Sequence, residues 1–200
     1  MPQSKPNENE RYSYADYLTW DDGKRWELID GQAFCMSPGP GRQHQKLSVV
    51  LTNLFYNYLQ GKTCEVYTAP FDVRLVDTDK DVPDEYIETV VQPDILVVCD
   101  PKKLDEKGVK GAPDLVIEIL SPSSARNDMI VKYQIYERFG VKEYWVVHPF
   151  EQLVQVFKLQ ENAKYGIPDR YGTGDVISVG LLGDLKIDLN QVFLPEKPME

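Results

Sequence analysis

Two short apolar runs that each carry an acidic residue constrain the fold of this sequence more than any other feature. Residues 92–99 read Gln-Pro-Asp-Ile-Leu-Val-Val-Cys, and residues 112–121 read Ala-Pro-Asp-Leu-Val-Ile-Glu-Ile-Leu-Ser. Short β-branched runs bounded by Pro, Asp and Ser are typical of buried strands. Asp94 stands at the start of the first predicted strand and Glu118 inside the second. Because an unpaired carboxylate is costly to bury, the two strands predict a shared cation site.

Side chains alternate between the two faces of a strand, and this alternation predicts where the acidic side chains point. Glu118 shares one face of its strand with Asp114 and Leu120. If the two strands are neighbours, Asp94 and Glu118 approach to about 4–5 Å. At that separation two carboxylates repel each other by about 3–4 kcal/mol at an effective dielectric constant of about 20. A divalent ion would remove this repulsion, and oxygen ligands favour Mg²⁺ or Mn²⁺ over Zn²⁺.

A second interpretation of the same residues needs no metal. Asp94 and Asp114 would then cap the starts of their strands, and Glu118 would pair with a lysine or arginine. Lys132, on the helix predicted to follow, either faces the acidic residues or forms a surface ion pair with Asp128, one helical turn earlier. The residues alone leave both interpretations open.

The remaining pattern predicts a mixed α/β (α+β) fold with an N-terminal β-hairpin. Residues 26–36 are an apolar hairpin around an Asp-Gly turn, and residues 43–59 carry an apolar stripe at helical spacing. A second helix is expected after Ser121, ending at Phe139. Further strands are predicted at 64–75, 141–147, 151–159, 176–179 and 185–189, with a loop at 165–173. This order of elements predicts a mixed sheet flanked by helices.

Two residues outside the paired strands are accessory candidates for a site. His44 lies in the first turn of the helix at 43–59, where a neutral imidazole could bind a metal or position a water. Glu27 lies on the first strand of the hairpin and is also explained as a partner for Arg25. An exposed histidine in a first helical turn is common, so both residues have structural explanations as well.

Length and composition indicate one globular domain. The 200 residues divide into a disordered tail at 1–10, a single domain at 11–190 and a C-terminal tail at 191–200. No run approaches the length of a membrane span and no basic-then-apolar leader is seen, so we expect a cytoplasmic protein. Three cysteines, an odd number, are expected to be reduced core residues: Cys35, Cys64 and Cys99.

The net charge of −10 argues against broad binding of nucleic acid, which depends on lysine and arginine neutralising phosphates. A local positive groove remains compatible with that total. Four lysines cluster between the two acidic strands, but acidic neighbours favour a solvated loop there: Lys102, Lys103, Lys107 and Lys110.

Several segments together resemble the Uma-two family of restriction-endonuclease-like proteins, which is abundant in cyanobacteria and part of the PD-(D/E)XK superfamily. The matching segments are 26–31, 38–44, 92–94, 112–123, 132–133 and 140–149. The resemblance implies a restriction-endonuclease-like fold, Mg²⁺ or Mn²⁺ held by Asp94 and Glu118, and by analogy a homodimer. The signature lysine would stand at position 120, where this chain has Leu120. The resemblance implies that Lys132 replaces it.

Three hypotheses about function follow. The first is a Mg²⁺-dependent DNA endonuclease with Asp94, Glu118 and Lys132 as its catalytic residues and Glu27, His44 and Asp114 as accessory candidates. The second is a catalytically inactive nuclease-fold module that binds a partner protein, which the acidity and Leu120 keep open. The third is metal-dependent cleavage of RNA.

Overall fold

In the computed structural model, which describes residues 6, 10–36, 39–76, 82–122 and 127–193, the strands form two six-stranded sheets and one two-stranded sheet. The central sheet has the order β12 (Asp169–Gly172), β11 (Leu153–Lys158), β10 (Glu143–His148), β9 (Leu115–Ile119), β6 (Ile95–Val98) and β3 (Glu65–Thr68). Only β9 and β10 pair in parallel within it, so the sheet is mixed.

The second sheet, which we call the hairpin sheet, begins with the predicted N-terminal hairpin. Its order is β2 (Gln32–Cys35), β1 (Trp26–Ile29), β5 (Val90–Val91), β4 (Val73–Arg74), β8 (Gly108–Lys110) and β7 (Leu104–Asp105). The two-stranded sheet is β13 (Val176–Ser178) with β14 (Lys186–Asp188). Asp30 and Gly31 form the hairpin turn with positive φ angles, which is the conformation that an Asp-Gly turn requires.

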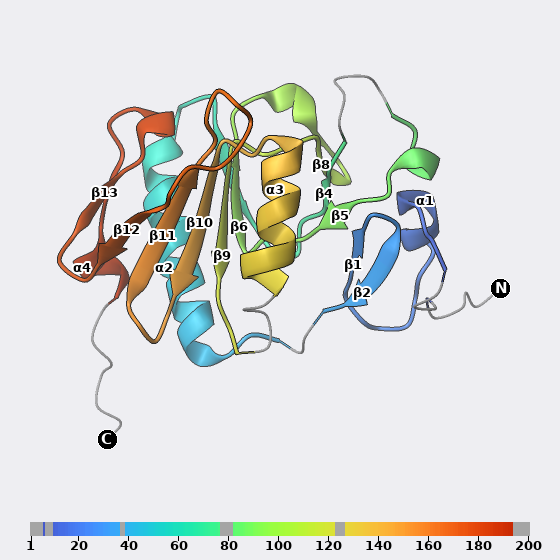
Figure 1. The fold of residues 1–200 in the computed structure, drawn as a ribbon, viewed down its shortest axis with the longest axis horizontal. Coiled ribbons are helices and arrows are strands. Elements are labelled where there is room, and N and C mark those ends of the chain that lie inside the picture. Colours follow the sequence, from blue (N-terminus) through green and yellow to red (C-terminus); the bar gives the residue numbers. More distant parts are fainter. Residues whose placement is uncertain (1–5, 7–9, 37–38, 77–81, 123–126, 194–200) are drawn as a thin grey trace.

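Helices cover the two faces of the central sheet (Figure 1). The long helix α2 (Arg42–Leu59) packs on one face through Leu47, Leu51 and Phe55, and α3 (Tyr133–Phe139) packs on the other. A π-helical segment, η3 (Asn127–Lys132), leads into α3. The short helices are α1 (Tyr14–Tyr17), α4 (Leu189–Val192) and the 3₁₀ turns η1 (Asp84–Tyr86), η2 (Pro101–Lys103) and η4 (Gly180–Leu182).

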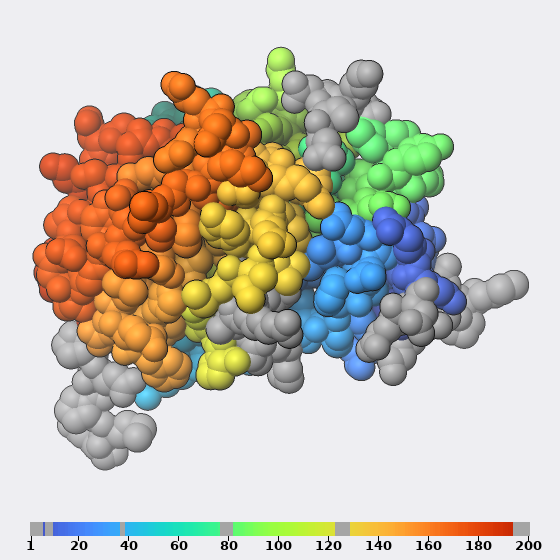
Figure 2. Space-filling model, viewed as in Figure 1, coloured from blue at the N-terminus to red at the C-terminus, as the bar shows by residue number. Residues whose placement is uncertain are grey.

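The period of β9 explains this layering. Leu115, Ile117 and Ile119 belong to the apolar cluster under α2, whereas Val116 and Leu120 belong to the cluster under α3. In the space-filling view, α3 lies between the C-terminal strands and the hairpin (Figure 2). Glu118 is on the α3 face of the strand, so its carboxylate is directed into an otherwise apolar layer.

The predicted fold class is confirmed, and several element boundaries differ from the prediction. The single strand expected at 64–75 is divided into β3 and β4, which belong to different sheets. The loop expected at 165–173 contains β12, which pairs with β11. Strands β7 and β8 were not predicted, because their two or three residues carry no readable periodicity.

The division into tails and domain stays a prediction. Residues 1–5, 7–9 and 194–200 lie outside the described residues, and α4 extends to Val192. Within the described part of the chain, no helix has the length and apolar character that crossing a membrane requires.

The prediction for the cysteines is wrong in two respects. Cys64 and Cys99 form a disulfide, because they are the next opposed pair after Glu65 and Val98 in the β3–β6 register. Cys35 is exposed on β2 rather than buried. Sequence spacing did not reveal the pairing because 35 residues separate the two cysteines.

We expect Phe55→Ala to lower the free energy of unfolding by about 3–5 kcal/mol, because it removes a fully buried ring from the core. Phe55 packs edge-on against Trp145, with ring centroids 5.8 Å apart. Val49→Ala on the same helix is the matched control, since Val49 is 66% exposed. Urea unfolding followed by circular dichroism measures both variants. Equal stability of the two would contradict the assignment of α2's buried face.

Candidate active site

Asp94 and Glu118 lie opposite each other on neighbouring strands, as the sequence predicted. Ile95 of β6 pairs with Ile117 of β9, so the next opposed pair in this antiparallel register is Asp94 and Glu118. The backbone N–H of Asp94 lies 3.4 Å from Glu118 Oε2, and the N–H of Ile119 donates to Asp94 Oδ2 at 2.8 Å. The two carboxylates therefore meet where the chain enters β6.

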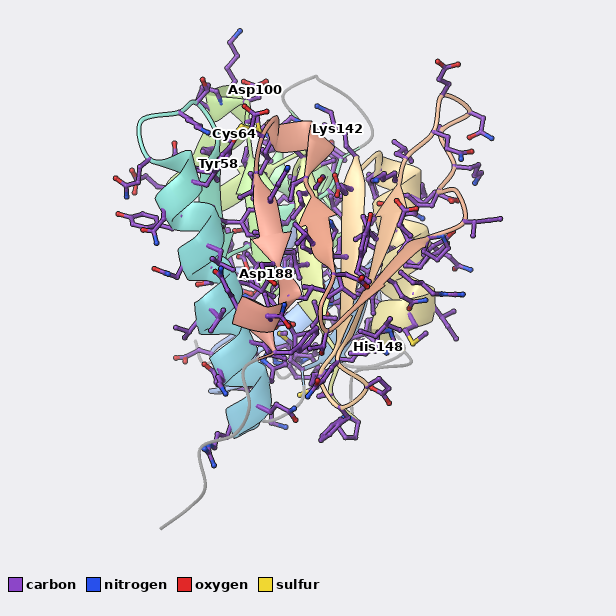
Figure 3. All side chains as sticks on the ribbon, turned by 90° about the vertical axis from the view of Figure 1, so that its left-hand side faces the viewer. Tyr58, Cys64, Asp100, Lys142, His148 and Asp188 are labelled. Carbon is purple, nitrogen blue, oxygen red and sulfur yellow. A yellow bond between two sulfur atoms is a disulfide. The ribbon has the colours of Figure 1, made fainter. Side chains whose placement is uncertain are left out.

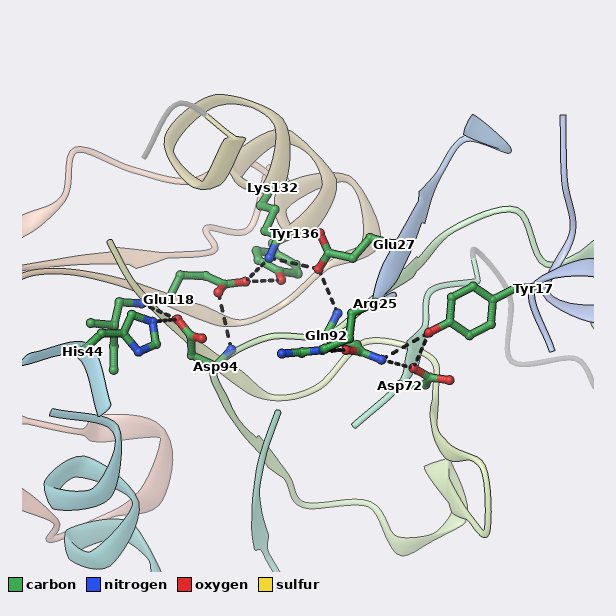
Figure 4. Close-up of polar contacts among 11 residues, drawn as sticks. Tyr17, Arg25, Glu27, His44, Asp72, Gln92, Asp94, Glu118, Lys132 and Tyr136 are labelled. Carbon is green, nitrogen blue, oxygen red and sulfur yellow. Dashed lines mark hydrogen bonds and ion pairs between the residues drawn. The ribbon is translucent and has the colours of Figure 1, made fainter. Parts of the chain in front are cut away.

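Lys132 lies between two buried carboxylates that come from different sheets (Figure 4). Its Nζ is 3.0 Å from Glu118 Oε1 on β9 and 3.1 Å from Glu27 Oε1 on β1. The side chains of Lys132 and Glu27 are only 5% and 4% exposed. The ammonium is thus well inside the range of about 6 Å over which a charge strongly affects a carboxylate. The side chain of Asp128, the partner in the alternative surface pair, lies outside the described residues.

Tyr136, one helical turn after Lys132, completes the environment of Glu118. Its hydroxyl donates to Glu118 Oε1 at 2.7 Å. Burial, together with the nearby carboxylates of Glu118 and Glu27, raises the pKa of Tyr136 well above its ordinary value of 10. The phenol therefore remains protonated and acts as a hydrogen-bond donor to the carboxylate throughout the neutral range.

His44 reaches the site from the first turn of α2. Its Nε2 lies 3.0 Å from Asp94 Oδ2, and the side chain is 11% exposed. The other ring nitrogen, Nδ1, is buried without a hydrogen-bond partner among the described residues. Two of the three accessory candidates therefore lie at the acidic pair, His44 through Asp94 and Glu27 through Lys132.

Leu120 and Asp114 are not part of this group. Leu120 is 8% exposed and packs in the apolar cluster with Ile135, so the signature position has become a core position. Asp114 accepts hydrogen bonds from the Cys99 N–H and the Lys142 ammonium, both at 2.7 Å. Four residues of strand place it about 13 Å from Glu118 along β9.

Figure 3 shows the two ends of the central sheet, with Cys64 and Lys142 at one and His148 at the other. Glu118 pairs with Val146, two residues before His148. Asp114 therefore acts as the strand-end cap of the second interpretation, and the geometry does not support it as an accessory residue.

Gln92 and Arg25 are polar residues of the site region that the sequence analysis did not select. The Gln92 N–H donates to Glu27 Oε1 at 3.0 Å, and its side-chain oxygen accepts from Arg25 Nε at 3.0 Å and Nη2 at 2.6 Å. The Gln92 Nε2 donates to Asp72 Oδ1 at 2.8 Å. The available signal was the position of Gln92, directly before Pro93 and Asp94, where the chain crosses between the two sheets.

The acidic pair, Lys132 and the residues around them line a pocket of about 760 Å³. Its polar lining includes Arg25, Glu27, His44, Gln92, Asp94, Glu118 and Lys132. Side chains of α2 and β2 add apolar walls, among them Phe34, Val49 and Tyr56, which are all exposed. A pocket with a few convergent polar groups and apolar walls is the usual form of a ligand site.

The donor chemistry of the pocket fits a hard divalent cation. Asp94, Glu118 and Glu27 carry three formal negative charges against the two cations Lys132 and Arg25, and their donor atoms are carboxylate oxygens. Within the described part of the chain, no group of three or more acidic, histidine or cysteine side chains is arranged so that it could hold a metal ion. Magnesium usually keeps several waters and takes only one or two carboxylates, so a site with two protein carboxylates is compatible with its chemistry.

Comparisons with known proteins bear on the family and the fold of the chain. The Uma2 family model, described as "Putative restriction endonuclease", matches residues 14–190. An uncharacterized protein of Synechocystis sp. is 32% identical over 128 residues, which are 63% of this chain and 62% of that relative, less than two thirds of its length. A crystal structure described as a "putative nuclease belonging to DUF820" from Anabaena variabilis superposes with a TM-score of 0.71 at 17% identity, covering 90% of this chain and 97% of the other. The last likeness shows a shared fold.

We expect Lys132→Met to lower the free energy of unfolding by about 3–5 kcal/mol, because it leaves two buried carboxylates without their cation. Adding Glu27→Gln should recover part of that loss, since one of the two charges is then removed. Lys158→Met is the control, because its ion pair with Asp169 is half exposed and worth at most about 1 kcal/mol. Chemical unfolding of the four proteins tests this. A loss for Lys132→Met no larger than for Lys158→Met would contradict the buried charge cluster.

Proposed function

This chain belongs to the Uma2 family, described as "Putative restriction endonuclease", and from that membership we propose that it is a metal-dependent DNA endonuclease. One observation carries the proposal beyond the family. Although the signature position holds Leu120, an ammonium group still lies 3.0 Å from Glu118, supplied by Lys132 from another element. The acidic pair and its lysine are therefore together in one pocket.

The proposed reaction is hydrolysis of a phosphodiester bond, with Asp94 and Glu118 holding Mg²⁺ or Mn²⁺. When bound, the ion would supply charge neutralisation at the phosphate and lower the pKa of a water. Asp94 is prepared for this role because His44 and the Ile119 N–H both bond its Oδ2. Its Oδ1 accepts no hydrogen bond from the residues that the structure describes, and so keeps its lone pairs for a cation.

Lys132 is proposed to stabilise the negative charge that develops on the phosphate in the transition state. Glu27 and Glu118 hold its ammonium from two sides, which fixes its position before substrate arrives. Tyr136 donates to the same Glu118 oxygen as the lysine and so restricts the rotation of that carboxylate. A group fixed in this way loses little entropy when the reaction begins.

A second candidate is an inactive nuclease-fold module that binds a partner protein. It is favoured by the net charge of −10 and by the two carboxylates that already neutralise Lys132. RNA as substrate and a homodimeric state, expected by analogy with nucleases that cut two strands, remain further proposals.

The shared ion is tested by titrating Mn²⁺ into the protein in a calorimeter. We expect one divalent ion to bind the wild type and Glu118→Gln to abolish the heat of binding, because one of two carboxylate ligands is lost. Glu143→Gln is the matched control, since Glu143 is an equally buried acid on β10 that does not line the pocket. An unchanged Mn²⁺ affinity in Glu118→Gln would contradict the proposal that Asp94 and Glu118 share an ion.

Cleavage itself is tested on supercoiled and linear DNA at low salt, with Mg²⁺ or Mn²⁺ and with EDTA. Low salt is needed because a protein of this charge makes few phosphate contacts, each screened beyond about 10 Å at 0.1 M. Lys132→Met should lose cleavage by about 100-fold or more while keeping most of its Mn²⁺ affinity, because the lysine acts on the transition state. Lys158→Met should cleave like the wild type. If the folded wild type cuts neither DNA nor RNA with either metal, the partner-binding module is the better account.

A further inference from the structure

We propose that Arg25 binds a phosphate group of the substrate in the acidic pocket, and that Gln92 and Asp72 are the positioning residues that hold it there. The inference rests on the proposed function, because it assigns a phosphate contact to that same site. Arg25 lies two residues before Glu27, directly before β1, and lines the pocket that contains Asp94, Glu118 and Lys132.

Among the residues that the structure describes, Arg25 forms no ion pair, and its observed partner is the neutral amide of Gln92. Three other arginines are paired, Arg11 with Glu88, Arg74 with Asp105 and Arg138 with Asp30, whereas Arg42 and Arg170, like Arg25, form no ion pair with a described residue. The amide oxygen of Gln92 accepts from both Nε and Nη2 of Arg25.

A chain of oriented hydrogen bonds fixes this guanidinium (Figure 4). The Gln92 Nε2 donates to Asp72 Oδ1, so the amide oxygen must face Arg25. Asp72 in turn accepts from the Tyr17 hydroxyl at 3.2 Å and from the Tyr14 hydroxyl at 3.0 Å. Burial and the Asp72 charge raise the pKa of both tyrosines, which keeps them protonated as donors. The orientation therefore originates in the N-terminal helix α1.

The bonds to Gln92 leave most of the donors of Arg25 available. A guanidinium has five N–H groups in a rigid fork, and two of them are used by the amide oxygen. The remaining three suit the bidentate geometry that arginine forms with phosphate. Because Gln92 is uncharged, holding the arginine does not consume its positive charge.

Arg25 also offsets the repulsion between the carboxylates of the site and a phosphate group. A pocket with three carboxylates repels a phosphodiester, and Lys132 is already shared between two of them. Arg25 supplies a second cation at the pocket edge, next to the strand that carries Glu27. In a chain with a net charge of −10, a single fixed cation of this kind accounts for a large share of phosphate binding.

Binding of a fluorescein-labelled DNA duplex, measured by anisotropy in EDTA between about 20 and 200 mM salt, tests the proposal without any need for cleavage. We expect Arg25→Ala to weaken binding about tenfold at low salt. The slope of log Kobs against log salt should fall by about 0.9, the value for one lost phosphate contact. A purely structural arginine would not change this slope.

Three further variants separate charge from position. Arg25→Lys should keep the slope and bind a few-fold more weakly, because it retains the charge without the fork. Gln92→Ala should also keep the slope, because the charge of Arg25 remains, and should weaken binding a few-fold, because the guanidinium is no longer held in place. The backbone N–H of residue 92 still bonds Glu27 in this variant. Arg170→Ala removes an exposed arginine on β12, at the far edge of the central sheet, and should bind like the wild type.

The proposal is overturned if Arg25→Ala keeps the wild-type affinity and slope, if Arg170→Ala matches its loss, or if the wild type binds no duplex at low salt. The first two outcomes are distinct from failure of the proposed function. If the protein binds DNA through Arg25 but never cleaves it, the phosphate site is supported and the nuclease function is not. If Arg25→Ala cleaves as well as the wild type, the nuclease function is supported and the phosphate site is not.

Discussion

The ion pairs of Lys132 with Glu27 and Glu118 are the interaction on which the rest of this structure depends. Glu27 belongs to the hairpin sheet, Glu118 to the central sheet and Lys132 to the segment leading into α3. One buried ammonium therefore connects three separate parts of the fold. Buried ion pairs seldom add net stability compared with apolar packing, but they define how their elements must be arranged. The pocket forms where these elements meet.

The two cations of the pocket are held in contrasting ways. Carboxylates surround Lys132, so its charge is balanced and its position is strictly set. A neutral amide holds Arg25, so its orientation is set without an ion pair to any described residue. The contrast matters because a cation that is already paired attracts a phosphate weakly from a distance, although it can still respond to charge that develops next to it.

Sequence reasoning reached the parts of the site that periodicity controls. The alternation in residues 114–120 predicted that Glu118 shares a strand face with Leu120, and neighbouring strands, which the structure has, were predicted to bring Asp94 close to it. Periodicity could not show that residues 64–75 change sheets or that Cys64 faces Cys99, because both depend on long-range pairing. Arg25 and Gln92 escaped notice for the same reason, since their bond spans 67 residues and neither lies in a recognisable motif.

The short connection between β5 and β6 has an evolutionary consequence. Residues 92–94 carry the chain from one sheet to the other, and within three positions they bond Glu27, orient Arg25 and present Asp94. An insertion or deletion there would displace all three contacts at once, whereas the exposed turn at 160–164 can change length without reaching the pocket. Divergence within such a lineage is therefore expected to preserve the length of the crossing more strictly than the identity of its side chains.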